Sequence, residues 1–397
     1  MTMKKTFAYI AFALALVGCQ KSLEYKDVIF LSGAEYSPAQ DMYIEGPTSK
    51  TIKVKSSDIV KENIDVYVQV DPSQVAAYNK ANGTDLVMLP EGSYAIMASN
   101  TQEDGTVVKT VTDHFTIPSG VAESIPLSFE ITTLDEFEPG VSYCAPVTIT
   151  KTSTGAEILK SSATIILVVK TITVSDCVNL NNSTWFNIED MWNNPDLNNL
   201  SAVTMEARVY ANGWRTSGHH ISSIVGIEEH MIVRFGDGSI DPSQIQIAGR
   251  GSNCTSADKF NLKQWYHVVA VDDGSKLTLY VDGKEQGSID SSSKATLNLG
   301  AKAEGGGFRI GASAGDNRTF NGWISEVRVW KRAVPIAEAE ANQCILNPDT
   351  AQDLVGYWRM NELNADGKLV DLSGNNFHGT PNNTVNWVEG IRCPIVE

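Results

Sequence analysis

Hydrophobic and polar positions alternate along residues 320–330, FNGWISEVRVW, with the period of two expected of a β-strand. Successive side chains of an extended chain point to opposite faces, so this segment predicts one apolar face and one charged face. The apolar face comprises Trp323, Ser325, Val327 and Val329, and the charged face comprises Ile324, Glu326, Arg328 and Trp330. We expect the apolar face to pack on a core.

A second segment, VTMEARVY at residues 203–210, has the same design with its charges in reverse order. Its predicted apolar face comprises Val203, Met205, Ala207 and Val209, and its predicted polar face comprises Thr204, Glu206, Arg208 and Tyr210. Long alternating runs fill much of the chain after residue 200, and only residues 336–344, IAEAEANQC, indicate a helix there, about two turns long. The second half of the chain is therefore predicted to be β-rich.

The first half alternates shorter β runs with Gly, Pro, Asn and Ser clusters, the spacing typical of a small antiparallel sandwich. One short helix interrupts it: Asp71 can cap this helix, Pro72 fits its first turn, and Gly83 ends it. All eight tryptophans follow residue 180, and this shift in composition places a domain boundary near residues 171–176.

Length and charge narrow the class of protein. A chain of 397 residues with 42% hydrophobic residues can build two or three cores. A formal charge of -16 without basic clusters argues against a nucleic-acid partner, whose phosphates an acidic surface would repel.

The N-terminus has the pattern of a targeting segment. Lys4 and Lys5 precede an apolar run at residues 7–17, which is too short to span a bilayer as a helix. Residues 16–19, LVGC, resemble a bacterial lipobox, and this resemblance implies removal of residues 1–18 and lipidation of Cys19. Residues 19–27 would then tether the protein to the outer membrane at the cell surface, with the lipid as its sole membrane contact.

Five further cysteines can form disulfides in an oxidising compartment. Cys144 is predicted to be a buried apolar residue, and the other four permit three pairings. We favour Cys344 with Cys393, which leaves Cys177 with Cys254.

Two known families resemble the two halves. Residues 27–172, with VDPSQVAAYNKANGTDLVMLPEGSY and EPGVSYCAPVTIT, resemble the uncharacterised β-sandwich domain near the N-terminus of many Bacteroidetes surface lipoproteins and some family 18 endoglycosidases. The order of WYHVVAVDDGSKLTLYVDGK, FRIGAS and FNGWISEVRVWKRA is similar to the laminin-G and concanavalin-A-like jelly-roll family. The resemblance implies an all-β chain, with an Ig-like sandwich at 28–172 and a jelly roll at 177–397. Because the first of these domains shows no convergent polar cluster, we interpret it as a spacer, and a second weak glycan site is the alternative.

In the jelly-roll topology the segments 203–210 and 320–330 are antiparallel neighbours. Glu206 would then face Arg328, and Arg208 would face Glu326, as two crossed ion pairs. We interpret these four charges as structural, because adjacent opposite charges satisfy each other before any ligand.

Catalysis is not predicted. Retaining glycosidases of this fold place two carboxylates on alternate residues of one strand, in a Glu-x-Asp-x-x-Glu pattern that the chain lacks. No nucleophile elbow, phosphate loop or His-Glu zinc motif occurs either. A glycoside hydrolase whose carboxylates converge from distant segments is the less favoured alternative.

Ligand contact is instead expected at the rim loops, because a sugar stacks its C–H face on an aromatic ring and offers its hydroxyls to polar groups. Two loops supply such residues: Trp214, Arg215, His219 and His220 in ANGWRTSGHH, and Trp185 and Trp192 in STWFNIEDMWNN. Burial between the sheets is the alternative for each tryptophan, and for Trp214 the two readings are balanced.

No cofactor is required, although relatives often carry a structural calcium ion. Oxygen ligands occur in GDNRTFNG, with Asp316 and Asn317, and in DLSGNN, with Asp371. These residues also suit any turn, which is the favoured reading.

Together these features predict a surface lipoprotein that binds a poly- or oligosaccharide as a non-catalytic part of a glycan-utilisation system. Outer-membrane transporters and glycosidases would be its partners. The alternative is an adhesin or assembly protein whose jelly roll binds protein.

Overall fold

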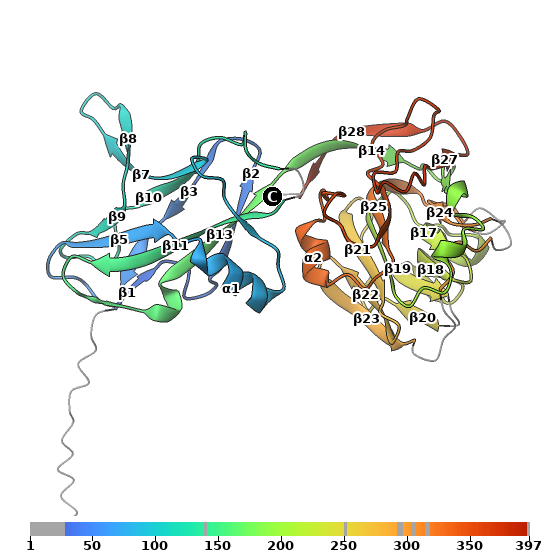
Figure 1. Ribbon diagram of the computed structural model, residues 1–397, viewed down its shortest axis with the longest axis horizontal. Coiled ribbons are helices and arrows are strands. Elements are labelled where there is room, and N and C mark those ends of the chain that lie inside the picture. Colours follow the sequence, from blue (N-terminus) through green and yellow to red (C-terminus); the bar gives the residue numbers. More distant parts are fainter. Residues whose placement is uncertain are drawn as a thin grey trace, which may run out of the picture.

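A computed structural model describes residues 28–138, 141–249, 252–291, 297–302, 306–313 and 318–394, and these form two β-rich lobes (Figure 1). Each lobe has its own apolar core, the first built from residues between Ile29 and Val169 and the second from residues between Val178 and Leu369. Residues 1–27, which include Cys19 and the predicted signal and tether, lie outside the described residues. Within the described part no helix has the length and apolar character needed to cross a bilayer.

Three sheets form the N-terminal lobe. The largest has the order β2 (Ala39–Ile44), β13 (Thr164–Thr171), β11 (Tyr143–Thr152), β5 (Ile64–Val70) and β9 (His114–Ile117), with β6 (Val87–Met88) paired to β11. The second has the order β3 (Thr48–Ile52), β10 (Leu127–Ile131), β7 (Tyr94–Thr101) and β8 (Val107–Val111), and the third β12 (Glu157–Ile158), β1 (Val28–Leu31) and β4 (Val54–Ser56). Alternate residues of the strands enter the core, as Ile64, Val66 and Val68 do on β5.

Parallel pairing is one difference from the predicted antiparallel sandwich. Strand β13 pairs in parallel with β2, and β1 with β12. Helix α1 (Ser73–Asn82) forms where the sequence indicates: Asp71 Oδ1 accepts the Ser73 N–H at 3.0 Å, and Gly83 ends the helix with φ 65°. Positive φ is readily available to glycine, which explains why the helix ends there.

Two larger sheets form the C-terminal sandwich. One has the order β23 (Lys284–Asp290), β22 (Lys276–Val281), β21 (Trp265–Asp272), β16 (Val203–Ala211), β25 (Gly322–Trp330), β14 (Thr173–Asn179) and β28 (Asn386–Cys393), with β26 (Leu354–Trp358) also paired to β25. The other has the order β20 (Ser252–Thr255), β19 (Ile240–Gly249), β18 (Met231–Asp237), β17 (Ser222–Ile227), β24 (Arg309–Ile310), β15 (Phe186–Asn187) and β27 (Thr380–Pro381). The predicted all-β fold class is confirmed.

Short helices complete the chain. Helix α2 (Ile336–Ala341) lies where the sequence predicts it, on the outer face of the sheet that contains β21 and β25 (Figure 1). Single 3-10 turns occur as η1 (Lys160–Ser162), η2 (Glu189–Met191), η3 (Pro195–Leu197) and η4 (Gly218–His220). A small second core, which includes Val269, Trp330 and Tyr357, forms beneath α2 and buries that part of the outer face.

The two lobes are connected by a two-stranded ribbon rather than by a single chain (Figure 1). Strand β14 begins at Thr173, two residues after β13 ends, and Thr173 pairs with Cys393 of the C-terminal strand β28. A disulfide joins Cys393 to Cys344, as predicted, and Arg392 forms an ion pair with Glu45 of the N-terminal lobe at 2.7 Å. These contacts restrain the lobes at their junction.

The predicted disulfide between Cys177 and Cys254 is wrong, because both thiols are free and buried. Cys254 lies on β20 and belongs to the core between the sheets, whereas Cys177 lies on β14 beside the core residue Val178, on the opposite face of its sheet. Cys144 is buried and free, as expected.

Strands β16 and β25 are antiparallel neighbours, and the register places Glu206 opposite Arg328. The next pair in the register is Arg208 with Ser325, so β25 carries one extra residue, a β-bulge, at this point. Glu326 occupies the bulge with φ 51°. The bulge reverses the alternation that the sequence predicted: Ile324 enters the core, and Trp323 lies with the polar face.

Glu206 is the centre of a buried polar network and is only 1% exposed. Its carboxylate accepts hydrogen bonds from Trp330 Nε1 at 2.7 Å and Arg328 at 3.1 Å, and it lies 3.2 Å from His267 Nε2. The first of the two predicted ion pairs therefore forms. A carboxylate so far from water is stable only with such a set of donors.

Glu326 holds the other side of the same arginine. Its carboxylate accepts hydrogen bonds from Arg328 at 2.6 Å, Tyr357 Oη at 2.6 Å and Arg359 at 3.0 Å. Arg328 also lies over the ring of Tyr357, 5.0 Å from its centroid. The bulge thus directs Glu326 to three donors: one on β25, one on β26 and one in the residue that follows β26.

His267 joins this network to helix α2. Its Nδ1 lies 2.7 Å from the Glu340 carboxylate and its Nε2 faces Glu206. Burial alone would lower the pKa of His267, but the hydrogen bonds to both carboxylates outweigh burial and raise it. The same contacts hold the pKa of Glu206 below its usual range despite burial.

We predict that Glu206→Ala lowers the free energy of unfolding of the C-terminal sandwich by about 3–5 kcal/mol, because it leaves Arg328 buried without that partner. Denaturant unfolding followed by tryptophan fluorescence measures this loss. Glu206→Gln, which keeps an acceptor of similar shape, should lose less. Equal stability of Glu206→Ala and the parent chain would contradict the structural role.

We also predict that the free energy of unfolding declines over the pH range above 6.5, the ordinary pKa of histidine. A histidine whose folded pKa is raised contributes fully below its ordinary value of 6.5, and this contribution is lost as pH rises through the folded pKa. Melting temperatures of the parent chain and His267→Gln across this range provide the test. The parent should show the steeper decline, and identical slopes would refute the assignment.

Candidate functional site

A polar pocket of about 470 Å³ lies among loops at one end of the C-terminal sandwich, which we call the rim pocket. These loops follow the ends of β14 and β16 and precede the starts of β25 and β28. The pocket is lined by Asn182, Ser183, Trp185, Arg215, Ser217, Thr319 and Asn383. Four segments that are distant in sequence therefore supply one site.

Side chains fasten these loops to one another. Thr319 Oγ1 donates to Asn182 at 2.6 Å, and Asn383 Nδ2 donates to the Ser183 carbonyl at 2.9 Å. Asn182 adopts φ 56°, a left-handed conformation that asparagine tolerates better than most residues. The loops are thus held by specific polar contacts, which favours a preformed pocket.

Trp185 and Arg215 are the two predicted site residues that the fold brings into the rim pocket. Trp185 is half-buried, and its backbone N–H donates to Asn382 Oδ1 at 2.7 Å. Arg215 Nε donates to the Ser217 carbonyl at 3.2 Å. An aromatic ring, a guanidinium, amides and hydroxyls together offer both the apolar and the hydrogen-bonding contacts that a sugar ring can use.

The other rim-pocket residues escaped the sequence reasoning. Asn182, Ser183, Ser217, Thr319 and Asn383 occur singly in loops, where Asn, Ser and Thr are common turn residues. Their convergence depends on the strand order of the sandwich, so no local pattern could have identified them.

Trp214, His219 and His220 do not line the rim pocket. Trp214 packs on the core, with its ring 4.9 Å from that of Phe235, so burial accounts for much of its surface. His219 and His220 both have positive φ, at 59° and 61°, where the chain turns through η4 toward β17. The predicted cluster in ANGWRTSGHH is thus divided by the fold, and only Arg215 reaches the pocket.

Trp192 is likewise separated from Trp185. Its Nε1 donates to the Phe308 carbonyl at 3.3 Å, and Lys302 lies 5.0 Å from its ring centroid. Gly307 lies against this indole, with no room for a β-carbon. Trp192 therefore fills a structural position beside β24, outside the residues that line the rim pocket.

Asp371, one of the predicted calcium ligands, has the hydrogen bonds of a turn residue. Asp371 uses both carboxylate oxygens as acceptors, one for the N–H groups of Tyr357 and Ser373 and the other for Ser373 Oγ and the Phe377 N–H. In the described part of the chain no group of three or more His, Cys, Asp or Glu side chains could hold a metal ion. Asp316 and Asn317 lie outside the described residues.

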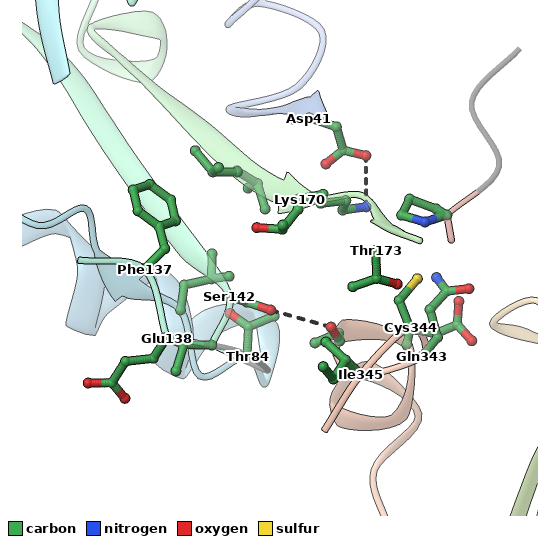
Figure 2. A pocket seen from close by; sticks show the side chains of 18 of the residues that line it. Asp41, Thr84, Phe137, Glu138, Ser142, Lys170, Thr173, Gln343, Cys344 and Ile345 are labelled. Atoms are coloured by element: carbon green, nitrogen blue, oxygen red, sulfur yellow. Dashed lines mark hydrogen bonds and ion pairs between the residues drawn. The ribbon is translucent and has the colours of Figure 1, made fainter. Parts of the chain in front are cut away.

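A larger cavity of about 710 Å³ lies between the two lobes (Figure 2). Its wall is mainly apolar, with Phe137 on one side and Ile345 beside the disulfide on the other. Most of its charged groups have partners: Lys170 pairs with Asp41 at 2.8 Å, and Glu340 and Arg359 belong to the buried network described above. The Glu138 carboxylate, which also lines the cavity, has no partner among the described residues. This cavity is therefore less suited to sugar hydroxyls than the rim pocket.

The second predicted ion pair, between Arg208 and Glu326, does not form. The bulge moves Glu326 out of register with Arg208, which stands opposite Ser325 instead. Arg208 stacks on Trp265, 4.8 Å from the ring centroid, and burial lowers its pKa to about 10 although the Glu326 charge opposes this. The expectation of a symmetrical charge pair is thus corrected to one ion pair and one arginine packed on an indole.

Comparison with known proteins agrees with this architecture. Residues 182–339 match the family model of the concanavalin A-like lectin/glucanases superfamily, and residues 25–156 match a family model described as an N-terminal domain. No curated protein gives a significant match. Both resemblances noted in the sequence are confirmed at the level of these domains.

Several solved structures are similar. A Bacteroides ovatus protein with a proposed role in carbohydrate binding is 21% identical, with 91% of this chain and 97% of that chain covered and a TM-score of 0.55. EndoBT-3987 from Bacteroides thetaiotamicron is 17% identical over 36% of this chain and 30% of its own, with a TM-score of 0.28. A heptameric pentraxin from Limulus polyphemus is 13% identical over 56% of this chain and 97% of its own, with a TM-score of 0.35. The first of these shows that the two-lobed fold is shared.

Proposed function

We propose that this chain, whose residues 182–339 match the concanavalin A-like lectin/glucanases superfamily, binds carbohydrate at the rim pocket without cleaving it. The observation that carries the proposal is the meeting of Trp185 and Arg215 with uncharged amides and hydroxyls from four loops. A volume of about 470 Å³ is within the usual range for small-ligand sites. The fold shared with a Bacteroides ovatus protein of proposed carbohydrate-binding role supports the same ligand class.

The carboxylates support a non-catalytic role. Glu206 and Glu326, the acidic residues of the two patterned strands, are 1% and 3% exposed and are engaged by arginine, tryptophan and tyrosine donors. A general acid needs a proton to give at working pH, whereas the contacts of Glu206 hold its pKa below the usual range. Among the described residues that line the rim pocket there is no carboxylate.

We extend the proposal to the cell surface. Lipidation at Cys19 would anchor the chain in the outer membrane, the N-terminal lobe would act as a spacer, and captured glycan would pass to glycosidases and an outer-membrane transporter. The motif LVGC and the preceding apolar run support this placement. A protein-binding adhesin is the competing function, and it predicts saturable binding to protein with none to glycan.

The anchor has a direct test. Cells that express the full chain should incorporate an alkyne-labelled fatty acid into the parent protein and release the protein with detergent only. Cys19→Ser should abolish the label and leave the chain unanchored. Equal labelling of parent and variant would contradict lipidation at this residue.

For the binding site, we predict that Trp185→Ala and Arg215→Ala each weaken binding to a glycan selected on an array by at least about tenfold, the effect of losing a stacking or charge-assisted contact. Titration calorimetry on folded protein provides the affinities. Trp387→Ala is the matched control, because Trp387 is 38% exposed and lies outside the pocket lining. Unchanged affinity in both pocket variants, or an equal loss in Trp387→Ala, would refute the assignment.

A further inference from the structure

A second polar feature lies on the outer face of the sheet that contains β16 and β25. Arg208 is 5% exposed, yet its guanidinium has no hydrogen bond or ion pair with any described residue. Ser325, directly opposite in the register and also 5% exposed, has a buried hydroxyl without a partner in the described part of the chain. Two adjacent buried polar groups without partners are unusual, because each costs desolvation energy.

The bulge at Glu326 explains why Arg208 lacks a counter-ion. The carboxylate that regular alternation would supply is bound to Arg328, Arg359 and Tyr357 instead. The Arg208 nitrogen atoms nevertheless keep some contact with solvent, since none is among the fully buried atoms without partners. The guanidinium is therefore not sealed from solvent.

Aromatic rings form a wall beside this arginine. Arg208 lies over Trp265, Trp265 lies 5.6 Å from Tyr210, and Tyr210 stacks on Trp323 with ring centroids 4.1 Å apart. The register places Trp265, Tyr210, Trp323 and Asn179 in one row across four strands. All three rings are half-buried, so they present apolar surface to solvent next to the free donors.

We propose that this surface binds a saccharide that carries a carboxylate, such as a uronic acid. The guanidinium of Arg208 can donate two parallel N–H bonds to one carboxylate, the geometry in which arginine recognises this group best. The C–H face of the sugar ring would pack on the aromatic wall. No covalent step is involved.

The site is separate from the rim pocket, since none of Arg208, Ser325, Trp265, Tyr210 and Trp323 lines that pocket. Its ligand class rests on the proposed carbohydrate binding, but its charge preference does not. A neutral glycan should therefore report on the rim pocket, and an acidic one on Arg208.

The test uses trigalacturonic acid and its methyl ester as probes, with calorimetric titration of the folded chain. The ester keeps the sugar rings and removes the negative charge. We expect the acid to bind and the ester to bind at least about tenfold more weakly, because the charge-assisted hydrogen bonds are lost. Equal binding of the two probes, or no binding of the acid, overturns the proposal.

Arg208→Met supplies the matched variant. It should abolish measurable binding of the acid, leave binding of a neutral glycan at the rim pocket unchanged, and keep or raise the melting temperature, since it removes a buried charge without a counter-ion. Arg328→Met, which removes an arginine with ion pairs in the same sheet, should lower the melting temperature. A similar loss of stability in both variants would show that Arg208 is structural and overturn the proposal.

Failure of the two functional proposals is distinguishable. Loss of neutral-glycan binding in the rim-pocket variants, with no binding of trigalacturonic acid, would sustain the rim pocket alone. Binding of the acid that depends on Arg208, with no neutral glycan bound by the parent chain, would sustain the Arg208 site and refute the rim pocket.

Discussion

The ion pair between Glu206 and Arg328 is the constraint on which the C-terminal sandwich depends. Both side chains are 1% exposed or less, on the outer face of the sheet rather than in the core between the sheets. Charges so far from water are tolerated only when every neighbouring polar group is arranged around them. The tryptophan, tyrosine and histidine donors, helix α2 and the second small core follow from that requirement.

The β-bulge at Glu326 is the local device that makes this arrangement fit. One extra residue on β25 brings Ser325 to the face that carries Arg328, at the position opposite Arg208 that regular alternation would give to Glu326. The bulge also changes the next pair in the register, so that Arg208 faces Ser325 instead of the Glu326 carboxylate. The single extra residue on β25 thus leaves Arg328 in the structural network and Arg208 free for the proposed ligand.

Local pattern was enough to predict much of the fold. The alternation at residues 203–210 gives the observed faces of β16, Asp71 and Gly83 bound helix α1, and Glu206 meets Arg328. These features depend on residues close in sequence or on one pair of neighbouring strands. The bulge was not predictable, because its only sign is the backbone of Glu326, and Ile324 was assigned to the wrong face as a result.

The candidate site was less accessible to sequence reasoning for a related reason. Trp185 and Arg215 were found by their chemistry, but Trp214 was not separable from the core residues until Phe235 was seen against it. The wrong disulfide prediction has the same origin. Cys177 and Cys254 were paired because they were the two cysteines left over, and only the sheet geometry shows that their thiols lie on different faces. Properties that depend on which face or loop a residue occupies require the assembled fold.

Hydrogen–deuterium exchange of the full chain, with and without a saturating glycan, tests the central claim most directly. The account predicts added protection in the loops that carry Trp185, Arg215, Thr319 and Asn383, with the cavity between the lobes unchanged. Protection confined to that cavity, around residues 134–138, 141–142 and 341–345, would contradict it.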